Sequence, residues 1–386
     1  MPESSGVVIV STRKVIDRYG KAGMIAASTR TRIKGLLSRI REMELEGAVV
    51  CGRDNLFYLS GHLMGEGNGP ALLFLPICGT PLLLYPEGES ALSSIRDFPG
   101  ESLPYGLSES GAGLAAAARS LQNRISGQLK PPLGIEPSIL PAQIAWELGM
   151  GSPTDWRDIE DTIVKLRTVK NGGEIERMKR AAQVVDAGQA RAQELFREGV
   201  TEIGLQAACR EAMERTAGKP IGCLADVLIG FRTALIGSPG GVAGENGAKR
   251  EDPAIVDLLP CVDGYYADCT RTLFAGEAPK DRLGVARLLL EVKADLEALL
   301  RPGVPAAEID GMARNRLSRE GSFPHHTGHG IGISHFEPPF IREDSEDVLQ
   351  KGNVITLEPG IYFEHWGARI EDDYLITEDG FEKLTG

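Results

Sequence analysis

The sequence predicts an α+β protein with two domains, a smaller α/β domain at the N-terminus and a larger domain built from two similar halves. A chain of 386 residues is long enough for two domains, each with its own core. Up to about residue 158, segments with the apolar spacing of helices alternate with short apolar strands. Beyond that point the order helix, helix, strands occurs twice, which indicates a duplicated half-domain. We therefore place the domains at residues 1–160 and 161–386.

The first domain begins its regular pattern near residue 29. Residues 31–46 have the apolar spacing of an amphipathic helix that Gly47 ends, and a short buried strand follows at residues 48–51. Two prolines and a glycine interrupt the apolar stretch 71–85. It therefore predicts two strands joined by a turn, because a membrane helix needs about 20 uninterrupted apolar residues. Residues 1–28 are interpreted as an accessory extension.

The second domain opens with a clear helix start. Asn171 followed by Glu174 resembles a capping box, in which the Asn side chain accepts hydrogen bonds from first-turn amides. The elements that follow are predicted as a helix after Thr201, strands at 225–274, helices at 279–300 and 306–319, and strands in the remainder.

Composition and charge exclude several classes of protein. The chain is 42% apolar and 25% charged, which excludes intrinsic disorder. It has 42 basic and 54 acidic residues, a net charge of −12 and no long basic run, so we expect neither nucleic acid nor a membrane as a partner. The six cysteines lack C-x-x-C spacing and no basic segment precedes an apolar one at the N-terminus, which together predict a cytoplasmic protein with reduced thiols.

The segment 255–272 carries the first chemical signal. Its Asp263-Gly264 pair, flanked by alternating apolar residues, predicts a two-residue hairpin turn. That turn sets Leu259 opposite Asp268, and side-chain alternation places Asp257 on the same face as Leu259. The two carboxylates are then diagonal neighbours within about 7–8 Å. Such a pair repels unless it shares a proton or a cation, although one Asp as a turn residue and the other in a salt bridge is the simpler alternative.

Three further segments favour a metal site over that alternative. Half of the six histidines, His325, His326 and His329, fall within five positions of a glycine-containing loop. Glu358 ends an apolar strand, and Glu371 is predicted on a strand that returns beside it. The second half of the domain thus repeats the acidic strand pair of the first.

Four carboxylates and one imidazole are suited to two divalent ions. Oxygen ligands with a single nitrogen and no thiolate favour Mn, Co, Fe or Zn in a catalytic site. Two ions about 3.5–4 Å apart would hold a bridging hydroxide as nucleophile and polarise the group that it attacks.

These motifs resemble the M24 metallopeptidases, a family with the pita-bread fold that includes methionine aminopeptidase, aminopeptidase P and prolidase. The resemblance covers residues 29–386 and is carried by Tyr266-Ala267-Asp268, Glu358-Pro359-Gly360 and Arg369-Ile370-Glu371-Asp372. It implies an α+β pita-bread domain and five metal ligands: Asp257, Asp268, His329, Glu358 and Glu371.

The N-terminal part is similar to the creatinase/prolidase N-terminal domain, at Tyr58-Leu59-Ser60-Gly61 and Lys165-Leu166-Arg167. This points to the proline-peptidase branch, since methionine aminopeptidases usually lack this domain. The resemblance also implies a homodimer, in which His62 and Glu66 of one chain are candidates to complete the pocket of the other.

Two departures from the family pattern concern the groups that face the substrate. Peptidase members usually carry a histidine seven residues after the ligand histidine, and that position is Phe336 here. His335 lies one position earlier and, on a strand without a bulge, would face the other way. A second family histidine, 17 or 18 residues before the first Asp, is replaced by the stretch 237–241, whereas His325 matches the proline-specific members.

The leading hypothesis is a dinuclear hydrolase of Xaa-Pro bonds, of the aminopeptidase P or prolidase type, with Mn or Co as the favoured ions and Zn or Fe as alternatives. Glu358 is expected to act as ligand and base, with His325 and His335 as further candidate catalytic residues. Arg369 would bind a substrate carboxylate, or pair with Asp372 or Asp373. The alternatives are a hydrolase or lyase of a small non-peptide metabolite, and a pita-bread binding module without catalysis.

Overall fold

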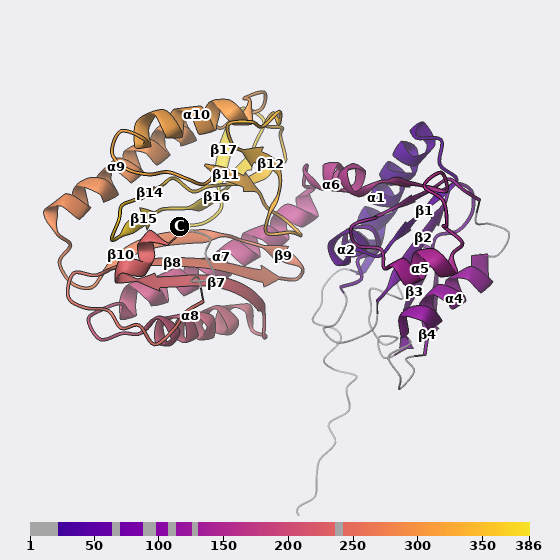
Figure 1. Ribbon diagram of the computed structural model, residues 1–386, viewed down its shortest axis with the longest axis horizontal. Coiled ribbons are helices and arrows are strands. Elements are labelled where there is room, and N and C mark those ends of the chain that lie inside the picture. The colour runs from indigo at the N-terminus through magenta and orange to yellow at the C-terminus, as the bar shows by residue number, and fades with distance from the viewer. Residues whose placement is uncertain (1–21, 64–69, 88–97, 107–112, 126–129, 236–241) are drawn as a thin grey trace, which may run out of the picture. The chain divides into compact units, whose positions relative to one another are not determined.

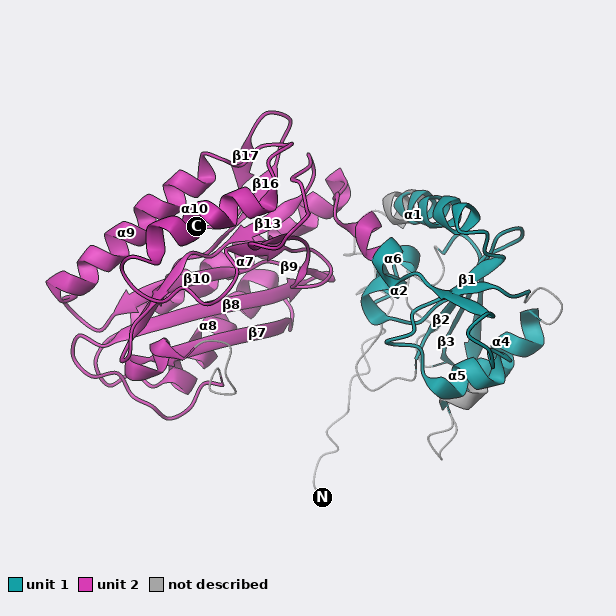
Figure 2. Cartoon of the chain, turned by 45° about the horizontal axis from the view of Figure 1, so that its top comes forward, with its two compact units in different colours: residues 1–162 teal, residues 163–386 magenta. Residues whose placement is uncertain are grey.

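The computed structural model describes residues 22–63, 70–87, 98–106, 113–125, 130–235 and 242–386. The chain divides into two compact units, residues 1–162 and 163–386, which Figure 2 shows in different colours. Most of the proposed extension at residues 1–28 lies outside the described residues, except that residues 22–28 belong to the first helix. None of the helices in the described part of the chain is apolar over a length that would span a bilayer.

Unit 1 is a six-stranded mixed sheet with helices. The strand order is β4-β3-β2-β1-β5-β6. The strands are β1 (Gly47–Val50), β2 (Leu72–Pro76), β3 (Leu82–Pro86), β4 (Glu101–Tyr105), β5 (Leu133–Ile135) and β6 (Trp156–Asp158). The helices are α1 (Ala22–Glu42), α2 (Arg53–Ser60), α4 (Gly113–Ile125), α5 (Ala142–Glu147) and α6 (Glu160–Arg167), the last of which crosses into unit 2.

The predicted strand pair at residues 71–85 is confirmed, because β2 and β3 are antiparallel neighbours. The helix predicted at 31–46 differs at both ends: it begins at Ala22 and stops at Glu42. Glu44, with φ 57°, takes the left-handed conformation that ends the helix, and the Leu45 amide donates to the Ile40 carbonyl at 3.1 Å. Gly47 instead begins β1, where a Cβ atom would lie 2.8 Å from the carbonyl oxygen of Leu75.

Unit 2 has two halves, each with a pair of helices and a set of strands, as predicted. The first half contains α7 (Gly172–Leu195), α8 (Glu202–Ala217), β7 (Gly222–Ile229), the 3₁₀ helix η4 (Gly230–Ala234), β8 (Pro253–Val262), β9 (Tyr265–Tyr266) and β10 (Cys269–Phe274). The second contains α9 (Lys280–Glu297), α10 (Ala306–Leu317), β11 (Gly328–Gly330), β12 (Glu337–Ile341), β13 (Val354–Leu357), β14 (Gly360–Tyr362), β15 (Gly367–Arg369), β16 (Asp372–Ile376) and β17 (Phe381–Lys383).

The strands of unit 2 lie between the two helix pairs, as Figure 1 shows. One sheet has the order β10-β8-β7, and a second has the order β12-β11-β13-β16-β17. A separate apolar core fills each half, one beneath α7 and α8 and one beneath α9 and α10. This is the pita-bread arrangement that the sequence predicted, with an α/β domain ahead of it.

Local signals in the sequence set two features of unit 2. The Asn171 side chain accepts from the amides of Gly173 and Glu174, and the Glu174 carboxylate accepts from the Asn171 amide, so the capping box forms. Asp263 and Gly264 have φ values of 52° and 81°, as a two-residue hairpin turn requires.

That turn produces the predicted strand register. Val262 pairs with Tyr265, and Asp257 pairs with Thr270. The side chain of Asp257 is therefore positioned by the turn, six residues away along β8.

The two halves meet where β10 lies beside residues 369–373. The Glu371 amide donates to the Thr270 carbonyl at 3.0 Å, and the Arg369 amide donates to the Thr272 hydroxyl at 2.9 Å. The Asp268 amide donates to the Asp373 carboxylate at 3.0 Å. These bonds bring acidic residues from both halves to one junction.

Gly328 offers a test of how tightly this junction is packed. A Cβ atom at Gly328 would lie 2.1 Å from the backbone oxygen of Thr356, so Gly328→Ala must move β11 away from β13. We expect the free energy of unfolding, measured by urea denaturation, to fall by about 1–3 kcal/mol. Gly311, in the middle of α10, has no such neighbour, and Gly311→Ala should raise it by about 0.5–1 kcal/mol. Equal effects from both substitutions would contradict the close approach.

Candidate metal centre

The five predicted ligands come from five places in unit 2 and lie around the junction of its halves. Asp257 lies on β8 and Asp268 directly before β10. His329 lies on β11, Glu358 directly after β13, and Glu371 between β15 and β16. All are buried except Asp257, which is partly buried.

The structure brings the ligand atoms of these residues close together. Asp268, His329 and Glu371 each offer one atom to a group in which all atoms lie within 4.8 Å of one another. The Nε2 atom of His329 is 3.9 Å from Asp268 Oδ2 and 3.7 Å from Glu358 Oε1. Atoms at these spacings are near enough to share ions after small side-chain movements.

Each of three carboxylates leaves one oxygen without a hydrogen bond. These buried atoms are Asp257 Oδ1, Asp268 Oδ1 and Glu371 Oε1. The other oxygen of Glu371 accepts from the Thr270 hydroxyl at 2.7 Å, and that of Asp257 pairs with Arg369 at 2.6 Å. Since a buried charged oxygen without a partner is costly, the arrangement fits divalent cations, which prefer carboxylate oxygen.

The electrostatics of the carboxylates lead to the same conclusion. Burial raises the pKa of Asp268 well above its usual range, and the charges of Glu371 and Asp257 add to the effect. Burial likewise raises the pKa of Glu371, with Glu358 and Asp257 contributing. These groups therefore need either protons or cations among them.

His329 is held in the form that binds metals. Its Nδ1 atom lies 3.0 Å from the carbonyl oxygen of Gly330, which leaves Nε2 to face Asp268 and Glu358. Burial lowers the pKa of His329, more than the charge of Glu358 raises it. The imidazole is therefore neutral near pH 7, as metal ligation requires.

Arg369 has a different partner from those expected. It pairs with Asp257, and its guanidinium also donates to the Tyr362 hydroxyl at 3.0 Å. Asp372 is paired instead with Arg271 and Lys293, and Asp373 accepts from the Asp268 amide. The expectation of an Asp372 or Asp373 partner is wrong, because β15 lies against β8 and directs Arg369 toward Asp257.

His325 lies beside Glu358. Its Nδ1 atom is 3.7 Å from Glu358 Oε2, and its Nε2 atom is 3.0 Å from the Tyr362 hydroxyl. Burial lowers the pKa of His325 to about 4, so it is a neutral hydrogen-bonding group near pH 7. His325 thus approaches one carboxylate oxygen of Glu358, and His329 approaches the other.

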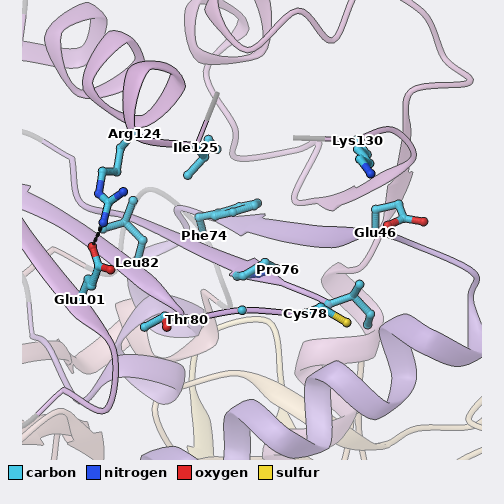
Figure 3. Close-up of a pocket in the computed structure, with 12 residues that line it drawn as sticks. Glu46, Phe74, Pro76, Cys78, Thr80, Leu82, Glu101, Arg124, Ile125 and Lys130 are labelled. Atoms are coloured by element: carbon cyan, nitrogen blue, oxygen red, sulfur yellow. Dashed lines mark hydrogen bonds and ion pairs between the residues drawn. The ribbon is translucent and has the colours of Figure 1, made fainter. Parts of the chain in front are cut away.

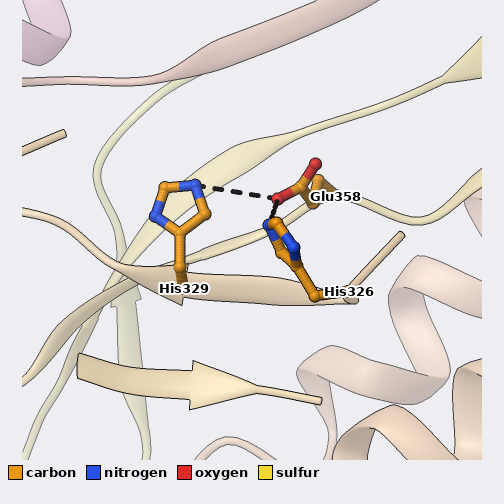
Figure 4. Close-up of side chains that lie close together, drawn as sticks. All are labelled: His326, His329 and Glu358. Carbon is orange, nitrogen blue, oxygen red and sulfur yellow. Dashed lines mark ion pairs between the residues drawn. The ribbon is translucent and has the colours of Figure 1, made fainter. Parts of the chain in front are cut away.

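His326 was not assigned a role from the sequence, yet it makes the shortest contact to Glu358. Its Nε2 atom lies 2.8 Å from Glu358 Oε1, the same oxygen that His329 approaches (Figure 4). The only signal in the sequence was its place between His325 and His329. Which of three neighbouring histidines turn toward a distant glutamate depends on the loop conformation, which the spacing does not determine.

His335 does not join this group. Residues 332–336 form a bend rather than a strand, so the argument from strand alternation does not apply to them. The His335 ring lies 5.7 Å from the Tyr266 ring, whereas the Phe336 ring lies 4.9 Å from His329 and 5.3 Å from His326. Phe336 thus occupies the side of the cluster where the family pattern led us to look for a histidine.

Two other regions named from the sequence contribute nothing to the described site. The stretch 237–241 and Glu66 lie outside the described residues. His62 is fully buried within unit 1, near the Tyr85 ring, so its side chain is not presented at the surface. Unit 1 also has a surface cavity of about 440 Å³ beside Phe74, Cys78 and Arg124, which includes none of the predicted site residues (Figure 3).

The raised pKa values predict how stability depends on pH in metal-free protein. Because Asp268 and Glu371 hold protons more tightly when folded, the free energy of unfolding should fall as pH rises above the ordinary carboxyl pKa of about 4. Asp268→Asn removes one of these groups and should raise the free energy of unfolding at about pH 8 by about 1 kcal/mol or more. Urea denaturation with a chelator at about pH 5 and pH 8 measures both effects. The exposed Asp379→Asn serves as control, and equal pH dependence in all three proteins would contradict the repulsion.

Comparisons with known proteins agree with this geometry. The profile of metallopeptidase family M24 matches residues 176–378, and that of the creatinase/prolidase N-terminal domain matches residues 32–169. An uncharacterized peptidase of Staphylococcus aureus is 28% identical over 360 residues, covering 92% of this chain and 99% of the relative.

Solved structures of similar proteins include a prolidase from Pyrococcus furiosus, with a TM-score of 0.78, 27% identity, and coverage of 91% of this chain and 99% of the prolidase. The dipeptidase PepE from Mycobacterium ulcerans has a TM-score of 0.78 and 26% identity, and the match covers 94% of this chain and 96% of that one. Because the M24 profile matches more than half of the chain and the N-terminal profile matches the region ahead of it, the chain belongs to metallopeptidase family M24.

Proposed function

We propose that the chain is a dinuclear metal-dependent hydrolase of Xaa-Pro peptide bonds, with Asp257, Asp268, His329, Glu358 and Glu371 as ligands. The observation that carries the metal centre is that three of the proposed ligands, Asp257, Asp268 and Glu371, each have a buried carboxylate oxygen without a hydrogen bond. The similarity to a prolidase at 27% identity over nearly the whole chain supports the substrate class.

Divalent ions, when bound, activate a water molecule as nucleophile and polarise the scissile carbonyl. Glu358 would accept the proton of that water because its carboxylate is ionised near neutral pH, although its low pKa makes it a weak base. Although burial alone would raise its pKa, the hydrogen bond from His326 and the neighbouring histidines lower the pKa to about 2. Its carboxylate is therefore ionised near neutral pH, and it passes the proton on to the leaving nitrogen.

His325 and Arg369 share one hydrogen-bonding partner, the hydroxyl of Tyr362. The Tyr362 hydroxyl lies 3.0 Å from both His325 Nε2 and Arg369 Nη1. The Arg369–Asp257 pair orients a metal ligand, which gives Arg369 a positioning role in addition to any contact with a substrate carboxylate. Substitution of either residue should therefore disturb the ligands as well as the substrate.

A second candidate function is supported by one observation, the aromatic ring at position 336. Phe336 packs against His329 but has no polar atom with which to stabilise a tetrahedral intermediate. Loss of one donor to an oxyanion typically costs about 10²–10³ in rate. The alternative is therefore a small non-peptide substrate whose reaction needs no such donor. A binding module without catalysis is disfavoured, because it would not need the whole set of metal ligands.

Hydrolysis of a panel of Xaa-Pro dipeptides and tripeptides tests the proposal. Metal-stripped protein supplied with Mn(II) or Co(II) should cleave members of the panel, and Asp268→Asn should lower kcat/KM by at least about 10²-fold. Asp379→Asn, which changes an exposed aspartate, should leave the rate unchanged. Absence of cleavage by folded protein that holds two ions would reject the peptidase and favour the non-peptide substrate.

Phe336→His separates the two functions directly. If Xaa-Pro peptides are the substrates, a histidine that replaces Phe336 near His329 should raise kcat on them by about tenfold or more. Phe336→Leu, which keeps the position apolar, should bring no such gain. A histidine variant that binds metal normally but is no faster than the leucine variant on the whole panel would argue against peptide substrates.

A further inference from the structure

We propose that His326 is a direct ligand of the ion that His329 and Glu358 bind. This would give the centre a second imidazole in addition to the single one in the five-residue set. The inference rests on the proposed metal centre and goes beyond it, because neither the sequence motif nor the family match assigns His326 to the metal.

The first argument is the spacing of the donor atoms. His326 Nε2 is 2.8 Å from Glu358 Oε1, and His329 Nε2 is 3.7 Å from that same oxygen. The three donor atoms all lie within 4.8 Å of one another. Donors that bind one ion at about 2.0–2.2 Å lie about 3–4.4 Å apart, so only a small side-chain movement separates this arrangement from a ligating one. Figure 4 shows both rings directed at the same carboxylate oxygen.

The second argument is the difference between His326 and its neighbour His325. Both ring nitrogens of His325 have partners in the protein, the His326 carbonyl at 2.8 Å and the Tyr362 hydroxyl at 3.0 Å. His326 instead directs Nε2 at Glu358, and its side chain is 30% exposed, compared with 6% for His329. His326 would thus bind the ion from the more open side, and His329 from the buried side.

The third argument is the wall that holds the two imidazoles. The Phe336 ring lies 4.9 Å from the His329 ring and 5.3 Å from the His326 ring, and the two imidazole rings are 5.5 Å apart. The Phe340 ring supports Phe336 at 4.9 Å. This apolar packing restricts the orientation of both imidazoles without competing for their nitrogen atoms, as preorganised ligation requires.

A second imidazole changes which metal the centre prefers. Imidazole ligands suit zinc, iron, nickel and copper, whereas manganese prefers oxygen. The ion at His326 and His329 should therefore favour Co(II) or Zn(II) over Mn(II) more strongly than a centre with a single imidazole does.

The test compares cobalt binding by four purified full-length proteins: the wild type, His326→Ala, His326→Gln and His335→Ala. The glutamine variant retains a hydrogen-bond donor toward Glu358 but has no imidazole, and His335 provides a matched histidine outside the cluster. Metal-stripped protein is loaded with Co(II), its uptake is measured by equilibrium dialysis, and the imidazoles per cobalt are counted by X-ray absorption.

We expect the wild type and His335→Ala to show two imidazoles for two cobalt ions, and both His326 variants to show one. Both His326 variants should also bind one ion at least about tenfold more weakly. Wild-type imidazole counts and affinity in His326→Gln would overturn the inference, because His326 would then act only as a hydrogen-bond partner of Glu358. If the wild type itself binds no cobalt, the proposed metal centre fails and this inference with it. Circular dichroism confirms that each variant is folded before loading.

Discussion

Crowding of buried carboxylates at the junction of the two halves is the constraint on which the rest of unit 2 depends. Asp268 comes from the first half and Glu371 from the second, and burial together with repulsion from neighbouring carboxylates raises the pKa of both. Two of these carboxylates have a protein partner for one oxygen and none for the other. Thr270 is the partner of Glu371, and Arg369 is the partner of Asp257.

Asp372 and Asp373, which follow Glu371 in the chain, add two more buried carboxylates that need partners. Asp372 and Asp373 are neighbours in the chain, yet their environments differ. Although burial alone would raise the pKa of Asp372, Arg271 and Lys293 lower it, so it is ionised and paired. Burial raises the pKa of Asp373 well above its usual range, and the main compensating contact is the backbone amide of Asp268. These two neighbours on β16 thus have different roles. Asp372 forms ion pairs, and Asp373 accepts a hydrogen bond from the amide of Asp268, a proposed metal ligand.

The loop beside Glu358 differs in kind from the carboxylates. The carboxylates of the proposed metal centre are positioned by paired strands, whereas His325 and His326 lie in the loop before β11 and Phe336 lies in a bend. Aromatic packing rather than hydrogen bonding connects these two segments. That packing places no polar atom of residue 336 at the cluster, so the polar contacts from this loop to the Glu358 side chain come from His326 and His325.

The sequence by itself determined the features that depend on neighbours along the chain. The Asp263-Gly264 turn sets the register that pairs Asp257 with Thr270, and Asn171 with Glu174 sets a helix start, because each is decided within a few residues. The order of elements and the fold followed from the same local patterns. Only the tertiary structure decided which groups meet from distant segments: Asp257 as the partner of Arg369, and His326 beside Glu358. The first contact joins positions 112 residues apart and the second joins positions 32 residues apart, through packing of separate strands and loops, and no local periodicity encodes the direction in which such side chains turn.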